Sequence, residues 1–137
     1  MPRHGMFDRL MPGDASGRAL KLFEPLSFWG GLDSDTGEII DRRHPQSGVT
    51  VAGTVLVMPS SRGSSSSSSV LAEALRNGTG PVAIVLGVRD PMVVLGAHVA
   101  RELYEISCPV IVVGQDTMDR IDTGMTVELA DETVRIR

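Results

Sequence analysis

The sequence predicts an α/β fold with a mainly parallel core and an added C-terminal hairpin. Three continuous apolar runs have the composition of strands that are covered on both faces. They lie at residues 54–57, 82–86 and 110–113. Helical patterns that begin near Val70 and at Asp90 separate them, and this alternation is typical of parallel strands joined by right-handed crossovers.

Particular residues mark the ends of these elements. Pro59 ends the first buried strand, because proline cannot donate to a β-ladder. Asn77 to Pro81 stop the first helix, whereas Asp90 and Pro91 supply the N-cap and the first position of the second. Near the C-terminus, residues 126–129 alternate strictly, and a turn at 131–132 leads into 133–136. We therefore expect a half-exposed hairpin that extends the sheet.

Length and composition limit the function classes. A chain of 137 residues is expected to form one domain, and its net charge of −4 makes nucleic acid and anionic membranes poor partners. No apolar run approaches the about 20 residues that span a bilayer, and no signal-peptide pattern is present, so we expect a cytoplasmic protein. The single cysteine, Cys108, excludes an internal disulfide and any metal cluster held by this chain alone. We expect it to be a small core residue.

The N-terminal third has weaker patterns. Residues 1–16 mix Gly, Pro, Asp and Arg without a period, which predicts a poorly ordered tail and leaves 17–137 as the single domain. A first strand is expected over residues 18–23. Further along, residues 33–37 have the composition of a turn, and residues 38–41 that of a short strand.

Residues 25–33 hold the only tryptophan, Trp29, and place Phe28 beside Gly30 and a second glycine. Such a segment is either a hydrophobic plug at the end of a sheet or a contact surface. Because the chain has few other aromatic residues and the glycines allow another backbone to approach, we favour an interface or a cleft. The polar stretch 42–45 is expected to be exposed, so that its histidine, His44, joins two arginines in a cationic patch.

The most unusual stretch is residues 58–69, where Arg62 and Gly63 are followed by a run of six serines between a strand and a helix. Backbone N–H groups converge at such a junction, and the helix dipole favours negative charge there. A flexible linker is one interpretation, but apolar patterns flank the run directly. A P-loop is disfavoured, because no lysine follows Gly63. An anion-binding or catalytic serine turn, with Arg62 as the anion clamp, and a merely well-capped helix both remain.

Four motifs in order resemble those of a known family. They are Pro25-Leu26-Ser27-Phe28-Trp29-Gly30-Gly31, His44-Pro45, Arg62-Gly63-Ser64-Ser65 and Asp90-Pro91. Together they are similar to the small subunit of the aconitase X family of dehydratases, from about Gly17 to the C-terminus. The resemblance implies the swivelling β/β/α domain that forms the mobile domain of aconitases.

The resemblance also implies a site. In aconitases a Gly-Ser-Ser turn of this domain faces the iron–sulfur centre across a cleft, and a serine there removes the substrate proton. By resemblance Ser64 is the catalytic base, while Arg62, Gly63 and Ser65 bind substrate. The longer aconitases place the clamp arginine after the serine pair, whereas Arg62 precedes it here.

The family further implies a larger, cysteine-bearing subunit in a heterodimer, which holds an iron–sulfur cluster or iron that this chain does not bind alone. Phe28, Trp29, Gly30 and His44 are expected at that interface or beside the cleft. The substrates associated with the family are cis-3-hydroxy-L-proline and 5-phosphomevalonate, and the arginine-rich, lysine-poor composition favours the first. A non-catalytic anion-binding or interaction module is the competing hypothesis.

Overall fold

Parallel strands form the centre of a seven-stranded sheet in this computed structural model, which describes residues 7–62, 65–130 and 133–137. The parallel strands, in their order across the sheet, are β7 (Val110–Val113), β6 (Ala83–Leu86), β4 (Val55–Met58) and β2 (Ala15–Lys21). Antiparallel strands flank them: β1 (Phe7–Met11) pairs with β7, and the hairpin of β8 (Thr126–Ala130) and β9 (Thr133–Ile136) continues beyond β2. The predicted α/β class, the three buried strands and the C-terminal hairpin are confirmed.

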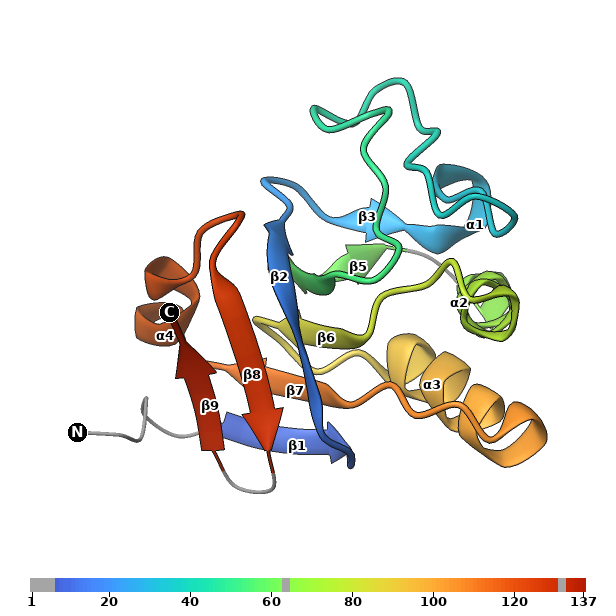
Figure 1. Cartoon of the computed structure of the whole chain (residues 1–137). Helices are drawn as coiled ribbons and strands as arrows, with labels where there is room; N and C mark the ends of the chain where they lie inside the picture. The colour runs from blue at the N-terminus through green and yellow to red at the C-terminus, as the bar shows by residue number, and fades with distance from the viewer. Residues whose placement is uncertain (1–6, 63–64, 131–132) are drawn as a thin grey trace.

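Alternating side chains of the central strands feed two hydrophobic cores, one on each face of the sheet. Leu56 and Met58 of β4 belong to the core under α2 (Ser65–Asn77) and α3 (Pro91–Tyr104). Val55 and Val57 belong to the other core, which α4 (Gln115–Arg120) and the β8–β9 hairpin cover. Figure 1 shows α2 and α3 on one side of the sheet and α4 with the hairpin on the other. Burial on both faces explains why these strands are continuously apolar.

The N-terminal segment corrects one prediction. Instead of a poorly ordered tail, residues from Phe7 onward form β1, and β2 begins at Ala15. β1 pairs antiparallel with β7, with Phe7 opposite Val113 and Arg9 opposite Ile111. The charges of Asp8 and Arg9 break the apolar pattern, so the pairing depends on the partner strand rather than on local sequence. The first six residues of the predicted tail lie outside the described part of the chain.

Two short strands and a single turn of helix were not anticipated. A two-residue strand β3 (Leu26–Ser27) pairs in parallel with β5 (Ser61–Arg62), and one turn of helix, α1 (Phe28–Gly31), follows β3. The strand expected over residues 38–41 is wrong, because this stretch makes only isolated bridges, between Leu32 and Ile39 and between Glu38 and Thr50. The turn predicted at 131–132 lies outside the described residues.

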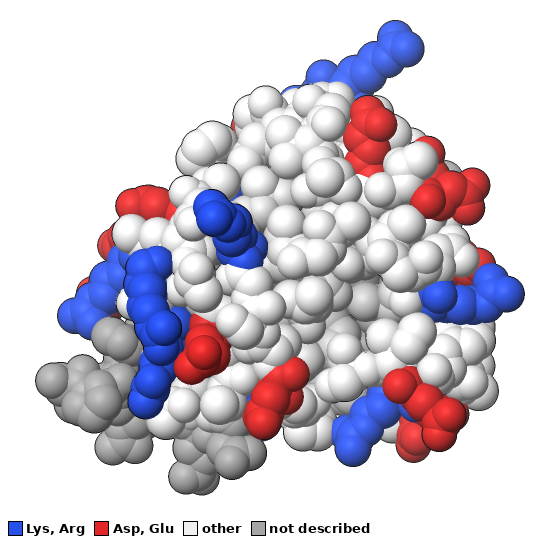
Figure 2. All heavy atoms as spheres, viewed as in Figure 1, with Lys and Arg blue, Asp and Glu red and all other residues white. Residues whose placement is uncertain are grey.

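Charged side chains are scattered on the face shown in Figure 2. Basic and acidic residues of both signs stand mainly around its margin, and its centre carries few of them. This face therefore has no single-sign field of the kind that steers nucleic acid or anionic ligands to a protein.

Candidate functional site

The carboxyl ends of the parallel strands carry the connections from which ligand sites of open α/β sheets are built. The connection after β4 contains Pro59, Ser60 and β5 and then reaches α2. The connections after β2 and β6 contain Phe23 and Val88 respectively. The serine segment thus lies on a strand-to-helix connection, as its sequence predicted.

The turn itself is bounded on both sides. Arg62 ends β5 and is paired in register with Ser27 of β3, while Ser65 is the first residue of α2. The predicted base Ser64 and its neighbour Gly63 lie between these two elements and outside the described residues. α2 runs for 13 residues, so its N-terminus carries the positive end of a full helix dipole next to the turn.

One hydrogen-bond network ties β5 to the next helix. The Ser61 hydroxyl donates to Oδ2 of Asp90. Oδ1 of the same carboxylate accepts the backbone N–H groups of Met92, at 3.0 Å, and Val93, at 3.3 Å. Asp90 is therefore the N-cap of α3, as predicted, and it also fixes the strand that leads into the serine turn.

The serines that follow the turn belong to α2, and two of them are buried. Ser67 and Ser68 are 2% and 8% exposed. Oγ of Ser67 faces the backbone N–H of Trp29 at 3.5 Å, and the carbonyl of Ser68 stands 2.9 Å from where a Cβ on Gly96 of α3 would lie. Glycine at position 96 thus lets α3 approach the α2 backbone closely, and the Ser67 hydroxyl links α2 to α1.

The two neighbouring aromatic residues have opposite environments. Trp29 is 63% exposed, whereas Phe28 has no exposed surface and belongs to the core under α2 and α3. Gly30 adopts a φ of +76°, and a side chain there would meet no atom within 4 Å. A side chain with no exposed surface cannot dock onto a partner, so the placement of Phe28 at an interface is corrected to the core. Trp29 and Gly30 remain available for an interface.

His44 corrects the prediction of an exposed cationic patch, because only 6% of its surface is exposed. Its Nδ1 accepts the backbone N–H of Gln46 at 3.1 Å, so its Nε2, 3.1 Å from the carbonyl of Glu24, must be the donor. This pairing engages both ring nitrogens of His44. The sequence did not reveal it, since Glu24 lies 20 residues away.

Trp29, Gly30 and His44 nevertheless share one cleft, with a volume of about 370 Å³. Ser27, Asp41 and Arg43 also line it. Three of the residues predicted for an interface or cleft are therefore brought together, with His44 at the buried wall rather than at the surface.

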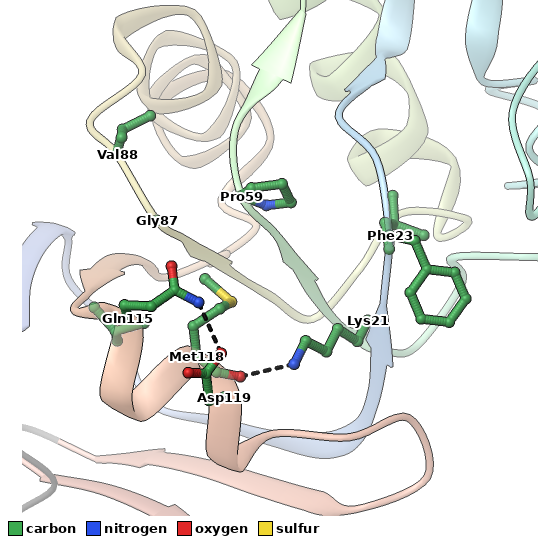
Figure 3. Close-up of a pocket in the computed structure, with 10 residues that line it drawn as sticks. Lys21, Phe23, Pro59, Gly87, Val88, Gln115, Met118 and Asp119 are labelled. Atoms are coloured by element: carbon green, nitrogen blue, oxygen red, sulfur yellow. Dashed lines mark hydrogen bonds between the residues drawn. The ribbon is translucent and has the colours of Figure 1, made fainter.

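A second pocket, of about 340 Å³, was not predicted and lies at the ends of the parallel strands (Figure 3). Phe23, Pro59 and Val88 line it together with Lys21 and Met118. The Lys21 ammonium donates to the carbonyl of Met118 at 2.9 Å, which fastens α4 to the end of β2. The sequence could have indicated this pocket only through position, because Phe23, Pro59 and Val88 each follow a parallel strand.

Metal ligands are lacking in the part of the chain that the structure covers. No group of three or more His, Cys, Asp or Glu side chains could hold a metal ion among the described residues. Cys108 is buried, and desolvation raises the pKa of its thiol from 9.0 to about 12, so the thiolate that a metal requires is disfavoured. Within the same residues, no helix combines the length and apolar character needed to cross a membrane.

Comparisons with known proteins agree with this architecture. Residues 7–137 match the family model described as the aconitase X swivel domain. A crystal structure of Thermococcus kodakaraensis aconitase X in its holo form superimposes with a TM-score of 0.83 at 29% identity, covering 97% of this chain and 99% of that one.

Two curated relatives differ in length. The chain is 45% identical, over 89% of its length, to a cis-3-hydroxy-L-proline dehydratase of Pseudomonas aeruginosa, but spans only 21% of that protein. It is 34% identical, over 91% of its length, to a phosphomevalonate dehydratase small subunit of Methanothermobacter thermautotrophicus and spans 92% of it. The family match over nearly the whole chain, on the sheet and helices described above, shows that this protein belongs to the aconitase X swivel domain family.

Proposed function

We propose that this chain is the small subunit of a hydro-lyase that removes water from a hydroxylated carboxylic acid, with cis-3-hydroxy-L-proline as the preferred substrate. The chain supplies the serine turn at residues 63–65 to an active site that a larger subunit completes. The observation that carries the proposal is the position of this segment, at the N-terminus of the 13-residue helix α2, in a domain whose relatives bear dehydratase names.

The turn suits proton removal. Dehydration takes a proton from the carbon beside the carboxylate, and the hydroxyl on the neighbouring carbon leaves as water. A serine is a base for that proton only when its alkoxide is stabilised, and a helix N-terminus supplies positive potential. In this proposal Ser64 removes the proton, while Arg62, Ser65 and the Gly63 backbone hold the substrate carboxylate.

The partner in this proposal is a cysteine-bearing large subunit, and an iron–sulfur cluster or iron belongs to it. The described residues of this chain do not fit such a group, since they offer no cluster of three ligands and the only cysteine is buried. This chain contributes proton removal and substrate binding. The name "small subunit" of the archaeal relatives supports a separate large chain.

Phosphomevalonate is the second candidate substrate. This chain matches the Methanothermobacter small subunit over nearly all of that protein, whereas the bacterial hydroxyproline dehydratase is several times longer. The higher sequence identity favours hydroxyproline, and the match to the small subunit keeps phosphomevalonate as the second candidate. Both substrates present an anion that the turn could hold.

The test is an assay of the two co-purified subunits with each substrate in turn. We expect dehydration of cis-3-hydroxy-L-proline by the pair and by neither subunit alone. Dehydration of 5-phosphomevalonate instead would replace the substrate and keep the reaction class. If the assembled pair dehydrates neither compound and only binds anions, the chain is a non-catalytic module and the proposal is wrong.

A further inference from the structure

Two exposed apolar side chains flank the pocket at the ends of the parallel strands. Phe23, in the connection after β2, is 74% exposed, and Val88, in the connection after β6, is 54% exposed. Pro59 stands between them, and Met118 lies deeper in the same pocket (Figure 3). We call Phe23, Pro59, Val88 and the pocket of about 340 Å³ that they line the Phe23–Val88 surface.

The backbone of Phe23 is held in place rather than loose. The side-chain amide of Gln46 accepts the Phe23 N–H at 3.0 Å and donates to the Lys21 carbonyl at 2.8 Å. Gln46 is itself anchored by the hydrogen bond from its N–H to the buried ring of His44. The buried histidine therefore helps to fix the backbone that carries the exposed aromatic ring, which lowers the backbone entropy lost on binding.

The position of this surface points to what covers it. Val88 lies two residues before Asp90, whose carboxylate holds Ser61 just ahead of the serine turn. A subunit that completes an active site at the turn must approach this end of the sheet. The matched segment is 21% of the longer Pseudomonas relative, so most of that protein lies outside this domain and is available to cover it.

We propose that the Phe23–Val88 surface binds the large subunit, which inserts an apolar side chain between Phe23 and Val88. Aromatic residues that are rigid and exposed act as anchors when a partner desolvates them. The inference rests on the proposed two-subunit dehydratase, and it assigns the contact to residues other than the Trp29 cleft.

Affinity measurements on the purified subunits test the assignment. Phe23→Ala should weaken binding of the large subunit by about 30-fold, the effect of truncating an interface anchor, and Val88→Ala by less. Leu103→Ala is the matched control, because Leu103 is 68% exposed but lies near the C-terminal end of α3, away from the strand ends. The control should bind like the wild type.

A cross-linking experiment tests the same surface without measuring affinity. Since Cys108 is buried and its thiol resists ionisation, a cysteine introduced by Val88→Cys can be labelled selectively with a photoreactive maleimide. The label at position 88 should cross-link to the large subunit, whereas the same label introduced by Leu103→Cys should not.

The outcomes separate this inference from the proposed function. Wild-type-like affinity of Phe23→Ala together with no cross-link from position 88, in a pair that still dehydrates substrate, would overturn the surface and leave the function intact. Loss of binding in a pair that has no dehydratase activity would support the surface and overturn the function. Self-association of the isolated chain that Phe23→Ala abolishes would show that a second copy, not the large subunit, covers the surface.

Discussion

The Ser61 hydroxyl donates a hydrogen bond to the Asp90 carboxylate, and the other oxygen of that carboxylate caps α3. One side chain thus joins the strand that enters the serine turn to the helix beside it. Because Asp90 serves two separate groups with two oxygens, its capping and positioning roles can be separated by mutation.

Ser61→Ala and Asp90→Ser should each lower turnover of the assembled dehydratase by about 10-fold, since small displacements of reacting groups are costly. Serine remains a good N-cap, but its shorter side chain offers one oxygen in place of two, so the cap and the contact with Ser61 compete for it. Urea denaturation should show little loss of stability for either variant, and the double variant should be no slower than either single one. Additive losses, or normal turnover, would mean that the contact only supports the fold.

The two adjacent aromatic residues of α1 should differ in their effect on stability when each is replaced by alanine. Phe28→Ala removes a fully buried ring and should lower the free energy of unfolding by about 3–5 kcal/mol. Trp29→Ala removes an exposed one and should change it by less than about 0.5 kcal/mol. Urea denaturation followed by circular dichroism measures both. Equal losses would show that Trp29 is a core residue and would remove it from the candidate interface.

Cys108 gives a pH-dependent prediction. Its pKa rises from 9.0 in water to about 12 in the folded protein, because burial disfavours the thiolate. The unfolded chain therefore loses this proton at a lower pH, so the free energy of unfolding should fall as pH rises from about 9 towards 12. Cys108→Ala should show a shallower decline than the wild type over that range. Identical slopes in the two proteins would contradict the assigned pKa.

The same burial makes the thiol slow to react. At pH 8 a thiol reagent such as Ellman's reagent should label Cys108 in the native chain far more slowly than in urea. Rapid labelling of the native chain would show that the thiol is accessible.

Sequence predicted the parts of the fold that local pattern determines. The central strands are apolar throughout because both faces are covered, and the cap at Asp90 needs only neighbouring residues. β1 was missed because its partner strand β7 lies about 100 residues further along the chain, and because Asp8 and Arg9 interrupt its apolar pattern. The burial of Phe28 likewise depends on helices that close over it, which its neighbours in sequence do not specify.

The candidate site was only partly predictable for the same reason. A strand, a turn glycine and a helix identify the serine turn locally. The buried state of His44 depends on Glu24 and Gln46, and the Phe23–Val88 surface depends on three separate connections meeting at one end of the sheet. Such features arise from tertiary packing, which a single sequence does not display.

The most direct test of the central claim is the turnover of the assembled two-subunit enzyme with Ser64→Ala, measured beside Ser69→Ala. Ser69 is exposed and lies more than a turn along α2, so its variant controls for the loss of one hydroxyl. We predict that Ser64→Ala lowers turnover by about 10²- to 10⁴-fold with substrate affinity much less affected, whereas Ser69→Ala remains near normal. Near-normal turnover of Ser64→Ala in the assembled enzyme would contradict the account.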